Sequence, residues 1–451
     1  MLRAALAVVL LAAAARAQPA QPPPAPPVPA NAPANALTLE RAVQLALERN
    51  YDLRRSEYQA QSAGEDATIA RALLLPTLDF NASRSRTRVG AGNVTVTPGF
   101  EAASAGVQIV QGYRASLQLQ QVVFAGGKRL FGYQAAQLNR DSAEANVEEQ
   151  RLTTVFTVEQ RFYELVRQQR QLKVLGDAAQ RSRDQAEFTQ RLFEGGRATQ
   201  ADVYAARANR DNDEINRLGQ EARVEVARQD LAVSVGLDPV ELLTIAEPAE
   251  MQQEPTQPPP VQEAVQKALA QRPGLKAFAL AAESQRKSVA AARGDYFPLV
   301  SVGASYSRNN TDLATFDDPN LGLNSQLAVS VNLSWNLFSG FSTNAAVSKA
   351  EIGVLQAVND LQNGRRNVAS DVERAVAQLQ AARQQARIAA QTVQTSSENL
   401  RLARTRQQVG VGTQLEVRDA ELRLTQSELA RANALVDGHE AESALRRATG
   451  G

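Results

Sequence analysis

The carboxylates with the most suggestive spacing stand just behind two glycine-rich stretches. Residues 195–202 read GGRATQAD, and residues 410–419 read GVGTQLEVRD. In both, glycines that can end a helix precede a threonine suited to cap the next helix. An acid follows the threonine by three positions, where a capping-box carboxylate belongs. Such acids could simply cap helices, or they could attract cations if several chains brought them together.

A capping role fits Asp202 and Glu416 but not Asp419. Asp202 and Glu416 occupy the capping-box position near the positive end of the helix dipole, so capping alone would account for both. Asp419 lies too far along for that role, and Ala205 stands at the equivalent place in the other stretch. Glu416 and Asp419 are spaced i, i+3 and share a helix face. A solvated surface acid is the alternative for Asp419.

The rest of the composition argues against catalysis. There are no cysteines and His439 is the single histidine, which excludes thiolate sites and most histidine-based catalysis or zinc binding. No catalytic triad, metal-ligand cluster or cofactor-binding loop is recognisable, so we expect no enzyme, cofactor or metal. The formal net charge of +1 gives no reason to expect a nucleic acid as a partner.

The N-terminal residues predict export. A short basic start precedes an apolar run at residues 4–15, and Ala15-Arg16-Ala17 has the form of a signal-peptidase site. We expect residues 1–17 to be a cleaved signal peptide and the proline-rich residues 18–36 to be a disordered tether. Lipidation is not expected, because no cysteine follows the signal. No later apolar run reaches about 18 residues, so any membrane crossing must use strands.

Proline placement and internal similarity divide the remaining chain into two copies of one unit. Residues 38–86 match residues 260–308 at a constant offset of 222. Later segments match at an offset of 214, as in Phe124-Ala-Gly against Phe338-Ser-Gly. The missing eight residues fall in a stretch typical of an exposed loop. We expect a first repeat at 37–238, a linker at the proline cluster 239–260, and a second repeat at 261–451.

Within each copy the hydrophobic period changes from helical to alternating and back. Val331 and Leu333 alternate with polar residues, as in a strand with one apolar face, whereas Val372 and Leu379 belong to a seven-residue repeat typical of helices packed side by side. The first repeat is expected to contain helices within 38–74, strands at 76–88 and 113–124, a long helix at 126–193 and a return helix at 200–236. The second is expected to contain helices within 261–296, strands at 298–309 and 327–338, a long helix at 340–407 and a return helix at 414–447.

The alternating segments have the length of strands that cross an outer membrane, although a soluble hairpin with one dry face is the alternative. Trp335 and Phe338 near one strand end, with Phe124 at the matching place in the first copy, are typical of aromatic residues at a membrane interface. Four strands cannot close a barrel, and open edges are not viable in lipid, so several chains must pool their strands. The long helices, about 100 Å at 1.5 Å per residue, would then form a tube or a stalk.

Three pairs of short segments recur in the same order in both copies. They are LLPTL and FPLVS, VFAGG and LFSGF, and two turns of the form G-x-x-T-x-x-[DE]-V. In these segments the chain resembles the TolC-like outer-membrane efflux proteins, from about Leu37 to its end. The resemblance implies an α+β membrane protein in which three chains contribute twelve strands to one outer-membrane β-barrel. A periplasmic barrel of α-helical coiled coils would continue it.

The resemblance also implies a function and partners. The function is an exit duct in the outer membrane of a Gram-negative cell, for drugs or for secreted polypeptides. The partners are two further copies in a homotrimer, a periplasmic adaptor protein, an inner-membrane transporter driven by ATP or by protons, and the outer-membrane lipid. The sequence specifies neither the cargo nor the energy source.

Site residues follow from the same resemblance. Glu416 and Asp419, with Asp202, fall at the acidic constriction that closes the tunnel at its periplasmic tip. Arg418 departs from the apolar residue expected between the first two. The residues expected to meet the adaptor are Gly195, Gly196, Arg197, Thr199, Val409, Gly410, Val411, Gly412 and Thr413.

A hypothesis of another class is a non-transport periplasmic coiled-coil protein, such as an adaptor or an adhesin. An adaptor needs a lipoyl-like β domain and usually an inner-membrane anchor, and neither is recognisable in the sequence. An adhesin has no need of two equivalent pairs of strands. The duct is therefore the leading prediction.

Overall fold

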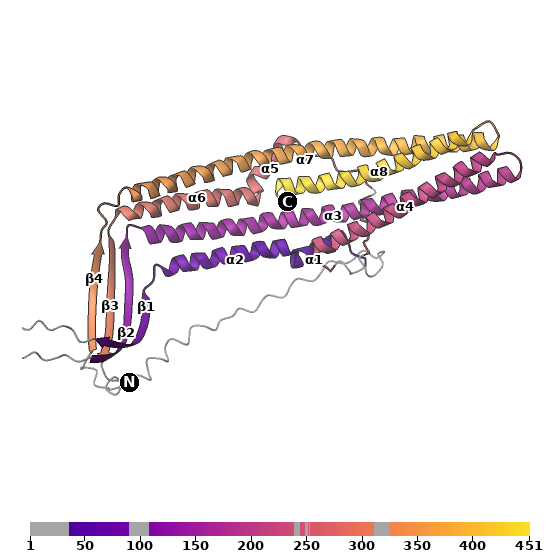
Figure 1. Ribbon diagram of the computed structural model, residues 1–451. Helices are drawn as coiled ribbons and strands as arrows, with labels where there is room; N and C mark the ends of the chain where they lie inside the picture. The colour runs from indigo at the N-terminus through magenta and orange to yellow at the C-terminus, as the bar shows by residue number, and fades with distance from the viewer. Residues whose placement is uncertain (1–35, 90–107, 239–243, 249–250, 252, 311–324) are drawn as a thin grey trace, which may run out of the picture.

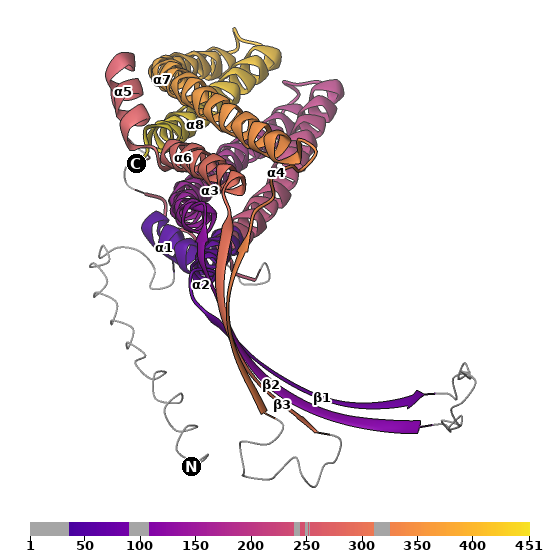
Figure 2. The same ribbon diagram turned by 90° about the vertical axis from the view of Figure 1, so that its left-hand side faces the viewer.

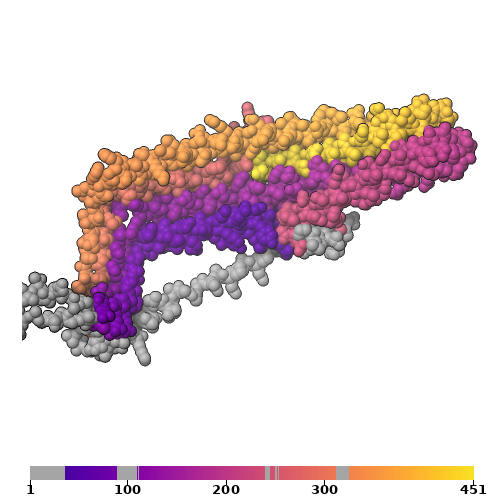
Figure 3. Space-filling view, in the orientation of Figure 1, coloured from indigo at the N-terminus to yellow at the C-terminus, as the bar shows by residue number. Residues whose placement is uncertain are grey.

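The computed structural model describes residues 36–89, 108–238, 244–248, 251, 253–310 and 325–451. The expected signal peptide and residues 18–35 of the expected tether lie outside this range. Long helices run along one axis. The strands lie at one end, and two short connections between helices lie at the other (Figure 1). The sheet bends away from the helical axis, which gives the molecule an L-shaped outline (Figure 3).

The two halves of the chain contain the same helices in the same order. The first half has α1 (Leu39–Arg49), α2 (Tyr51–Ala72), α3 (Lys128–Glu194) and α4 (Gln200–Val235); the second has α5 (Val261–Gln271), α6 (Pro273–Arg293), α7 (Ser342–Gln408) and α8 (Gln414–Thr449), with a short 3₁₀ helix η2 (Gly294–Tyr296) after α6. The helices α3 and α7 have 67 residues each, and α4 and α8 have 36 each. The long and return helices begin and end within two residues of the predicted bounds.

Single residues set the boundary between α1 and α2 and the boundary between α5 and α6. Asn50 separates α1 from α2, because its Oδ1 accepts hydrogen bonds from the backbone N–H groups of Asp52 (2.9 Å) and Leu53 (3.1 Å) and so caps the second helix. In the second half α5 ends before Arg272 and Pro273 opens α6, at the first helical position where proline is well tolerated.

Four antiparallel strands form one sheet at the end of the helices. They are β1 (Thr77–Val89), β2 (Gln108–Ala125), β3 (Leu299–Asn310) and β4 (Ser325–Ser334), paired in the order β1-β2-β3-β4. β2 begins at Gln108 rather than at the predicted residue 113. β4 ends at Ser334, so the predicted range 327–338 is wrong at its C-terminal boundary.

That boundary is set by the turn into α7. Trp335 leaves the paired strand and donates its indole Nε1–H to the backbone oxygen of Tyr296 (3.2 Å). Gly340 and Phe341 then adopt positive φ angles of 60° and 65° before α7 begins. The apolar alternation runs on past the last paired residue to Leu337, which is why alternation alone overextended the predicted strand.

The two faces of the sheet differ sharply in polarity. Side chains alternate between faces along each strand, and directly paired residues such as Phe80 and Leu117 share a face. The large apolar residues of one face are 41–73% exposed: Leu78, Phe80, Leu117, Leu119, Leu327, Val329, Val331 and Leu333. The opposite face carries Asp79, Asn81, Ser116, Gln118, Ser305, Ser307, Ser330 and Asn332. In the part of the chain that the structure describes, no helix is long and apolar enough to cross a membrane.

The helices change neighbours at the middle of the bundle, which we call the waist. Between the sheet and the waist, α2, α3, α6 and α7 lie side by side in the order of the strands. Beyond the waist, α4 continues the line of α2 and α8 continues the line of α6 (Figure 1). The α3–α4 and α7–α8 hairpins then run together to the far end, with α3 packed against α8.

A hydrophobic core at the waist anchors both the start of the chain and the segment between the repeats. Phe162, Leu165 and Leu231 are fully buried there. Leu37 forms a parallel bridge with Ile245, and Met251 is 1% exposed. The described residues of 244–260, which we call the strap, therefore pack against the bundle within the range predicted as a linker.

Candidate functional site at the helical tips

Two short turns join the long helices at the end farthest from the sheet (Figure 1). The first tip, Gly195–Thr199, joins α3 to α4, and the second tip, Val409–Thr413, joins α7 to α8. Gly196 and Gly410 have φ angles of 69° and 83°, which is the left-handed conformation that ends a helix. One glycine in each tip therefore has the backbone role expected from the sequence.

The other glycine of each tip, Gly195 or Gly412, does not have a positive φ angle. Gly195 has an ordinary φ of −83°. Gly412 is not among the residues with positive φ, but a Cβ atom on it would lie 2.8 Å from the backbone nitrogen of Gln407. The second tip therefore needs glycine at two positions, at Gly410 for its φ angle and at Gly412 for close backbone packing.

The first tip carries a complete capping box. Thr199 Oγ1 accepts a hydrogen bond from the Asp202 backbone N–H (3.2 Å), and Asp202 Oδ2 accepts from the Thr199 backbone N–H (2.9 Å) and hydroxyl (2.7 Å). The hydrogen bonds from the Thr199 side chain and backbone lower the pKa of Asp202 below its usual value. Asp202 is therefore engaged in capping α4, as the first of the two interpretations predicts.

Glu416 and Asp419, the carboxylates that follow the second tip in α8, have exposed arginines as their partners. Thr413 Oγ1 accepts from the Glu416 backbone N–H (3.2 Å), while the Glu416 carboxylate lies 3.7 Å from Arg406 Nη1. Asp419 Oδ2 accepts from Arg423 Nε (2.8 Å), and both side chains are more than half exposed. Glu416 and Asp419 therefore lie on the same hairpin with solvent access, and Asp202 lies on the other hairpin with partners of its own.

Arg418, the residue that departs from the expected apolar type, joins the two hairpins. Its Nη1 and Nη2 donate to the two carboxylate oxygens of Asp213 on α4, at 2.7 and 3.1 Å. The side chains are 18% and 11% exposed. The hydrogen bond to Asp213 raises the pKa of Arg418. A bidentate pair with this degree of burial fixes the position of α8 relative to α4.

A second charged group is buried beside this pair. The Glu421 side chain is 4% exposed and accepts from Arg404 Nη2 on α7 (2.8 Å). Burial raises the pKa of Glu421, and the hydrogen bond from Arg404 opposes that change. Arg181 on α3 contacts Thr425 (3.0 Å) and Glu428 (3.2 Å) on α8. Charged contacts therefore tie α8 to α3, to α4 and to α7 near the tips.

The residues expected to meet a partner are mostly exposed. At the first tip Gly195, Gly196, Arg197 and Thr199 are exposed, and at the second tip Val409, Gly410, Val411 and Thr413 are exposed. Gly412 is half-buried. The apolar side chains of Val409 (68% exposed) and Val411 (67%) in the second tip, and of Leu415 (77%) at the start of α8, are largely exposed. The second tip therefore presents an apolar surface, and the first tip presents a polar one.

The three aromatic residues expected at a membrane interface gather where the sheet meets the helices. Phe124 is near the end of β2, and it is 46% exposed. Trp335 and Phe338 lie beyond β4, and the Phe338 ring packs edge-on against Phe341 at 5.7 Å. Their exposure agrees with an interface role, which stays a prediction.

The chain is similar to known proteins over most of its length. The family model described as outer membrane efflux protein matches residues 42–237 and 264–451. The chain belongs to this family. The outer membrane efflux protein BepC of Brucella suis is 25% identical over 418 residues, which cover 92% of this chain and 85% of BepC. The alkaline protease secretion protein AprF of Pseudomonas aeruginosa is 24% identical, with 86% and 79% coverage.

Solved structures show the same fold. The Campylobacter jejuni CmeC outer membrane channel superposes with a TM-score of 0.78 at 19% identity, covering 91% of this chain and 85% of CmeC. The outer membrane protein VceC of Vibrio cholerae gives a TM-score of 0.76 at 22% identity, with 92% and 96% coverage. This outer membrane efflux protein therefore has the helical bundle and small sheet of those channels.

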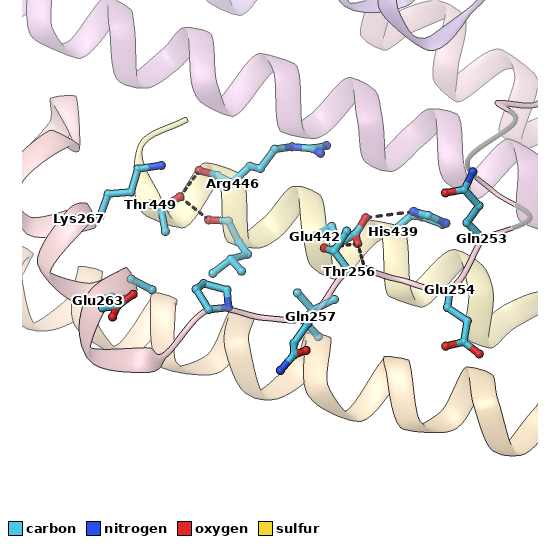
Figure 4. A pocket seen from close by; sticks show the side chains of 14 residues that line it. Gln253, Glu254, Thr256, Gln257, Glu263, Lys267, His439, Glu442, Arg446 and Thr449 are labelled. Atoms are coloured by element: carbon cyan, nitrogen blue, oxygen red, sulfur yellow. Dashed lines mark hydrogen bonds and ion pairs between the residues drawn. The ribbon is translucent and has the colours of Figure 1, made fainter.

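The waist of this outer membrane efflux protein also holds the single histidine of the chain, His439, in a buried position. A cavity of about 680 Å³ lies there, lined by residues of the strap, α5, α7 and α8 (Figure 4). His439 is 6% exposed, and its Nδ1 lies 3.1 Å from Glu442 Oε2. Thr256 on the strap donates its backbone N–H and its hydroxyl to Glu442.

This network has a structural role. Burial disfavours the charged form of Glu442, but hydrogen bonds from His439 and Thr256 outweigh it and lower the pKa of Glu442 to about 2. The ionised carboxylate therefore accepts from both partners and holds the strap on α8. Among the described residues, no group of three or more histidine or acidic side chains could hold a metal ion.

Proposed function

We propose that this outer membrane efflux protein is the exit duct of a tripartite export system. It would pass small molecules or secreted polypeptides from an inner-membrane pump, across the periplasm and through the outer membrane. One observation carries the proposal: the sheet has an exposed apolar face and lies at the end of helices that span about 100 Å. A surface of that kind suits lipid, and helices of that length suit a periplasmic tunnel.

The duct is a homotrimer. β1 and β4 are the outer strands of the sheet, and an open strand edge inside a bilayer leaves backbone groups without hydrogen bonds. Pairing β4 of one copy with β1 of the next removes all edges when three copies close a barrel of twelve strands. The repeated order of the elements supports an internal duplication.

The helical tips face the periplasm in this arrangement. Glu416 and Asp419 from three copies form an acidic constriction. Their carboxylates are available for this role, because their partners within the chain are exposed arginines that hold a carboxylate weakly. The exposed Val409, Val411 and Leu415 form an apolar contact for the helical hairpin of a periplasmic adaptor. The assignment of Asp202 to the constriction has less support, because its carboxylate caps α4.

The rival hypothesis, a periplasmic adaptor, lacks support. The family match covers both halves of the chain, strands included. An adaptor also has no use for a sheet with one exposed apolar face.

Detergent-extracted protein, incorporated into planar bilayers, tests the proposal. We expect a mass of three chains in solution and stepwise ion conductance in the bilayer. The matched control is the same preparation dissociated by heat, which should give no steps. A monomer that stays soluble without detergent, or trimers that insert without conducting, would contradict the duct.

A further inference from the structure

The apolar face of the sheet ends in a row of arginines. Residues 78, 80 and 82 of β1 are Leu, Phe and Ala, and the next three positions on the same face are Arg84, Arg86 and Arg88. The pairing register fixes this face, because Phe80 lies opposite Leu117 and Arg84 lies opposite Tyr113. All three arginines are exposed. Apolar and cationic segments therefore follow each other along one face of one strand.

The neighbouring strands β2 and β3 also carry an aromatic residue and an arginine on this face, near the arginine row. Arg308 on β3 lies opposite Ala115 of β2, which itself lies opposite Ala82 of β1, so Arg308 shares the face of the row. The Arg84 guanidinium packs over the Tyr113 ring, 5.4 Å from its centre. An aromatic ring beside the cations is typical of the border between an apolar band and water.

The four strands hold almost no negative charge to balance this row. Their one acidic residue is Asp79. Asp79 alternates with Leu78 and Phe80, so it points to the opposite face. The fifth arginine of the strands, Arg114, pairs with Ser83 and so also lies on the opposite face, where its Nε donates to Asn309 (2.7 Å).

The row lies at the end of the sheet that is farthest from the helices (Figure 2). This step rests on the proposed function: with the helices in the periplasm, the far end of the strands reaches the outer leaflet of the outer membrane. Charged side chains on a lipid-facing surface are tolerated there, because their cost falls toward the interface. Their aliphatic stems can lie along apolar surface while the guanidinium groups stay at headgroup level.

We propose that Arg84, Arg86 and Arg88 bind the phosphate groups of the phosphorylated glycolipid of the outer leaflet. Guanidinium groups bind phosphate oxygens in a bidentate way and stay charged at any relevant pH. Three of them at alternate positions, about 7 Å apart along a strand, match a ligand with more than one phosphate. Acyl chains of the same lipid would cover Leu78 and Phe80. The row therefore fixes the height of the barrel in the membrane through a specific lipid contact.

The test measures binding of lipid A to the full-length trimer in detergent by native mass spectrometry. The variants are the triple change Arg84→Gln, Arg86→Gln, Arg88→Gln and, as a matched control, Arg114→Gln on the opposite face. We expect the triple variant to bind lipid A at least about tenfold more weakly, because each arginine near an anionic surface contributes roughly fivefold. Arg114→Gln should bind like the unchanged protein. A triple lysine variant should bind with intermediate affinity, because lysine keeps the positive charge but cannot make the bidentate hydrogen bonds.

Two comparisons identify the ligand. Lipid A with its phosphates removed should bind the unchanged protein no better than the triple variant binds intact lipid A. Inorganic phosphate at millimolar concentration should not displace lipid A, and displacement would indicate a free-anion site instead. Equal binding of lipid A by the triple variant and by the unchanged protein would overturn the proposal.

Conductance in planar bilayers separates this inference from the proposed function. If the unchanged protein conducts but the triple variant binds lipid A equally well, the lipid contact is wrong and the duct stands. If the unchanged protein neither inserts nor conducts, the proposed function fails, and the lipid contact that rests on it falls too.

Discussion

Glu442 is the residue on which attachment of the strap depends. It accepts hydrogen bonds from His439 on its own helix and from Thr256 on the strap. Its folded pKa of about 2 lies below the ordinary value of 4.5. A depressed carboxyl pKa contributes stability that is fully present above the ordinary pKa and is lost as the pH falls through the folded value.

The strap should therefore loosen in acid. We expect the Thr256 amide, which donates to Glu442, to lose its protection from hydrogen exchange as the pH falls from about 4.5 to about 2. Glu442→Gln should lose protection at neutral pH by about 1.5 kcal/mol or more, because hydrogen bonds to a charged group are replaced by neutral ones. The control is Glu254→Gln, an exposed strap residue that lines the same cavity. The same pH profile in Glu442→Gln and in the unchanged protein would contradict this account.

Sequence reasoning found some of the site residues and missed others for identifiable reasons. The capping of α4 by Thr199 and Asp202 is local, so three positions of sequence suffice to predict it. Glu421 interrupts the stripe of Val417, Ala420 and Leu424 that buries α8, and a charged residue in an apolar stripe was a usable signal. The Arg418–Asp213 pair joins residues 205 positions apart, and no local pattern reveals its partner.

At the scale of the element, the second tip depends on two glycines for different reasons. Gly410 needs its φ of 83°. At Gly412, an added Cβ would meet backbone atoms of Gln407 at 2.8 Å and Arg406 at 3.0 Å. Backbone atoms cannot move away as a flexible side chain would, so the turn itself must shift.

Gly412→Ala should therefore disturb the second tip although the φ angle of Gly412 is not positive. We expect a cost of about 1–3 kcal/mol, as for other overpacked sites, and faster hydrogen exchange across residues 406–416. The matched control is Gly195→Ala in the first tip, where the nearest atoms to an added Cβ lie at 3.5 and 3.6 Å. Gly195→Ala should change exchange little. Equal effects of the two substitutions would refute the packing argument.

The positions of the elements were largely predictable. Prolines, glycines and the hydrophobic period located all four strands and the long helices, because each signal acts within a few residues. The end of β4 was not predictable in this way. The side chains of Trp335 and Leu337 continue the alternation, while strand pairing stops at Ser334 because the chain turns to begin α7.

At the scale of the whole molecule, the proposed gate needs three copies, because one chain alone supplies only two of its carboxylates, Glu416 and Asp419. Glu416→Ala combined with Asp419→Ala should raise conductance and weaken the block by divalent cations added on the side of the helical tips. Six carboxylates around one axis attract cations, and their removal takes that attraction away. The cap of α8 should survive, because Thr413 bonds to the backbone of residue 416 and not to its side chain.

Asp211→Ala is the control for the gate. Asp211 is an exposed acid on α4 that pairs with the adjacent Arg210, so its removal changes the charge by one unit near the tips without touching the proposed constriction. Block by divalent cations that persists in the double variant would mean that the two acids do not line the narrowest point.

The family predicted from the sequence is confirmed by the family match over both halves of the chain. The order of strand-start, strand-to-helix and tip motifs, repeated twice, made that prediction possible. The number of copies in the assembly was inferred from the open sheet edges and from the resemblance, and it stays a proposal.

The contact between Arg418 and Asp213 has a mechanical consequence. Both groups are mostly shielded from water, so separating them would leave two dehydrated charges without partners. A force that pulls on the α7–α8 hairpin at its tip is therefore transmitted to the α3–α4 hairpin. Within each chain the two hairpins should move together as one stiff unit. If three copies form the proposed tunnel, its entrance should widen by sliding between chains.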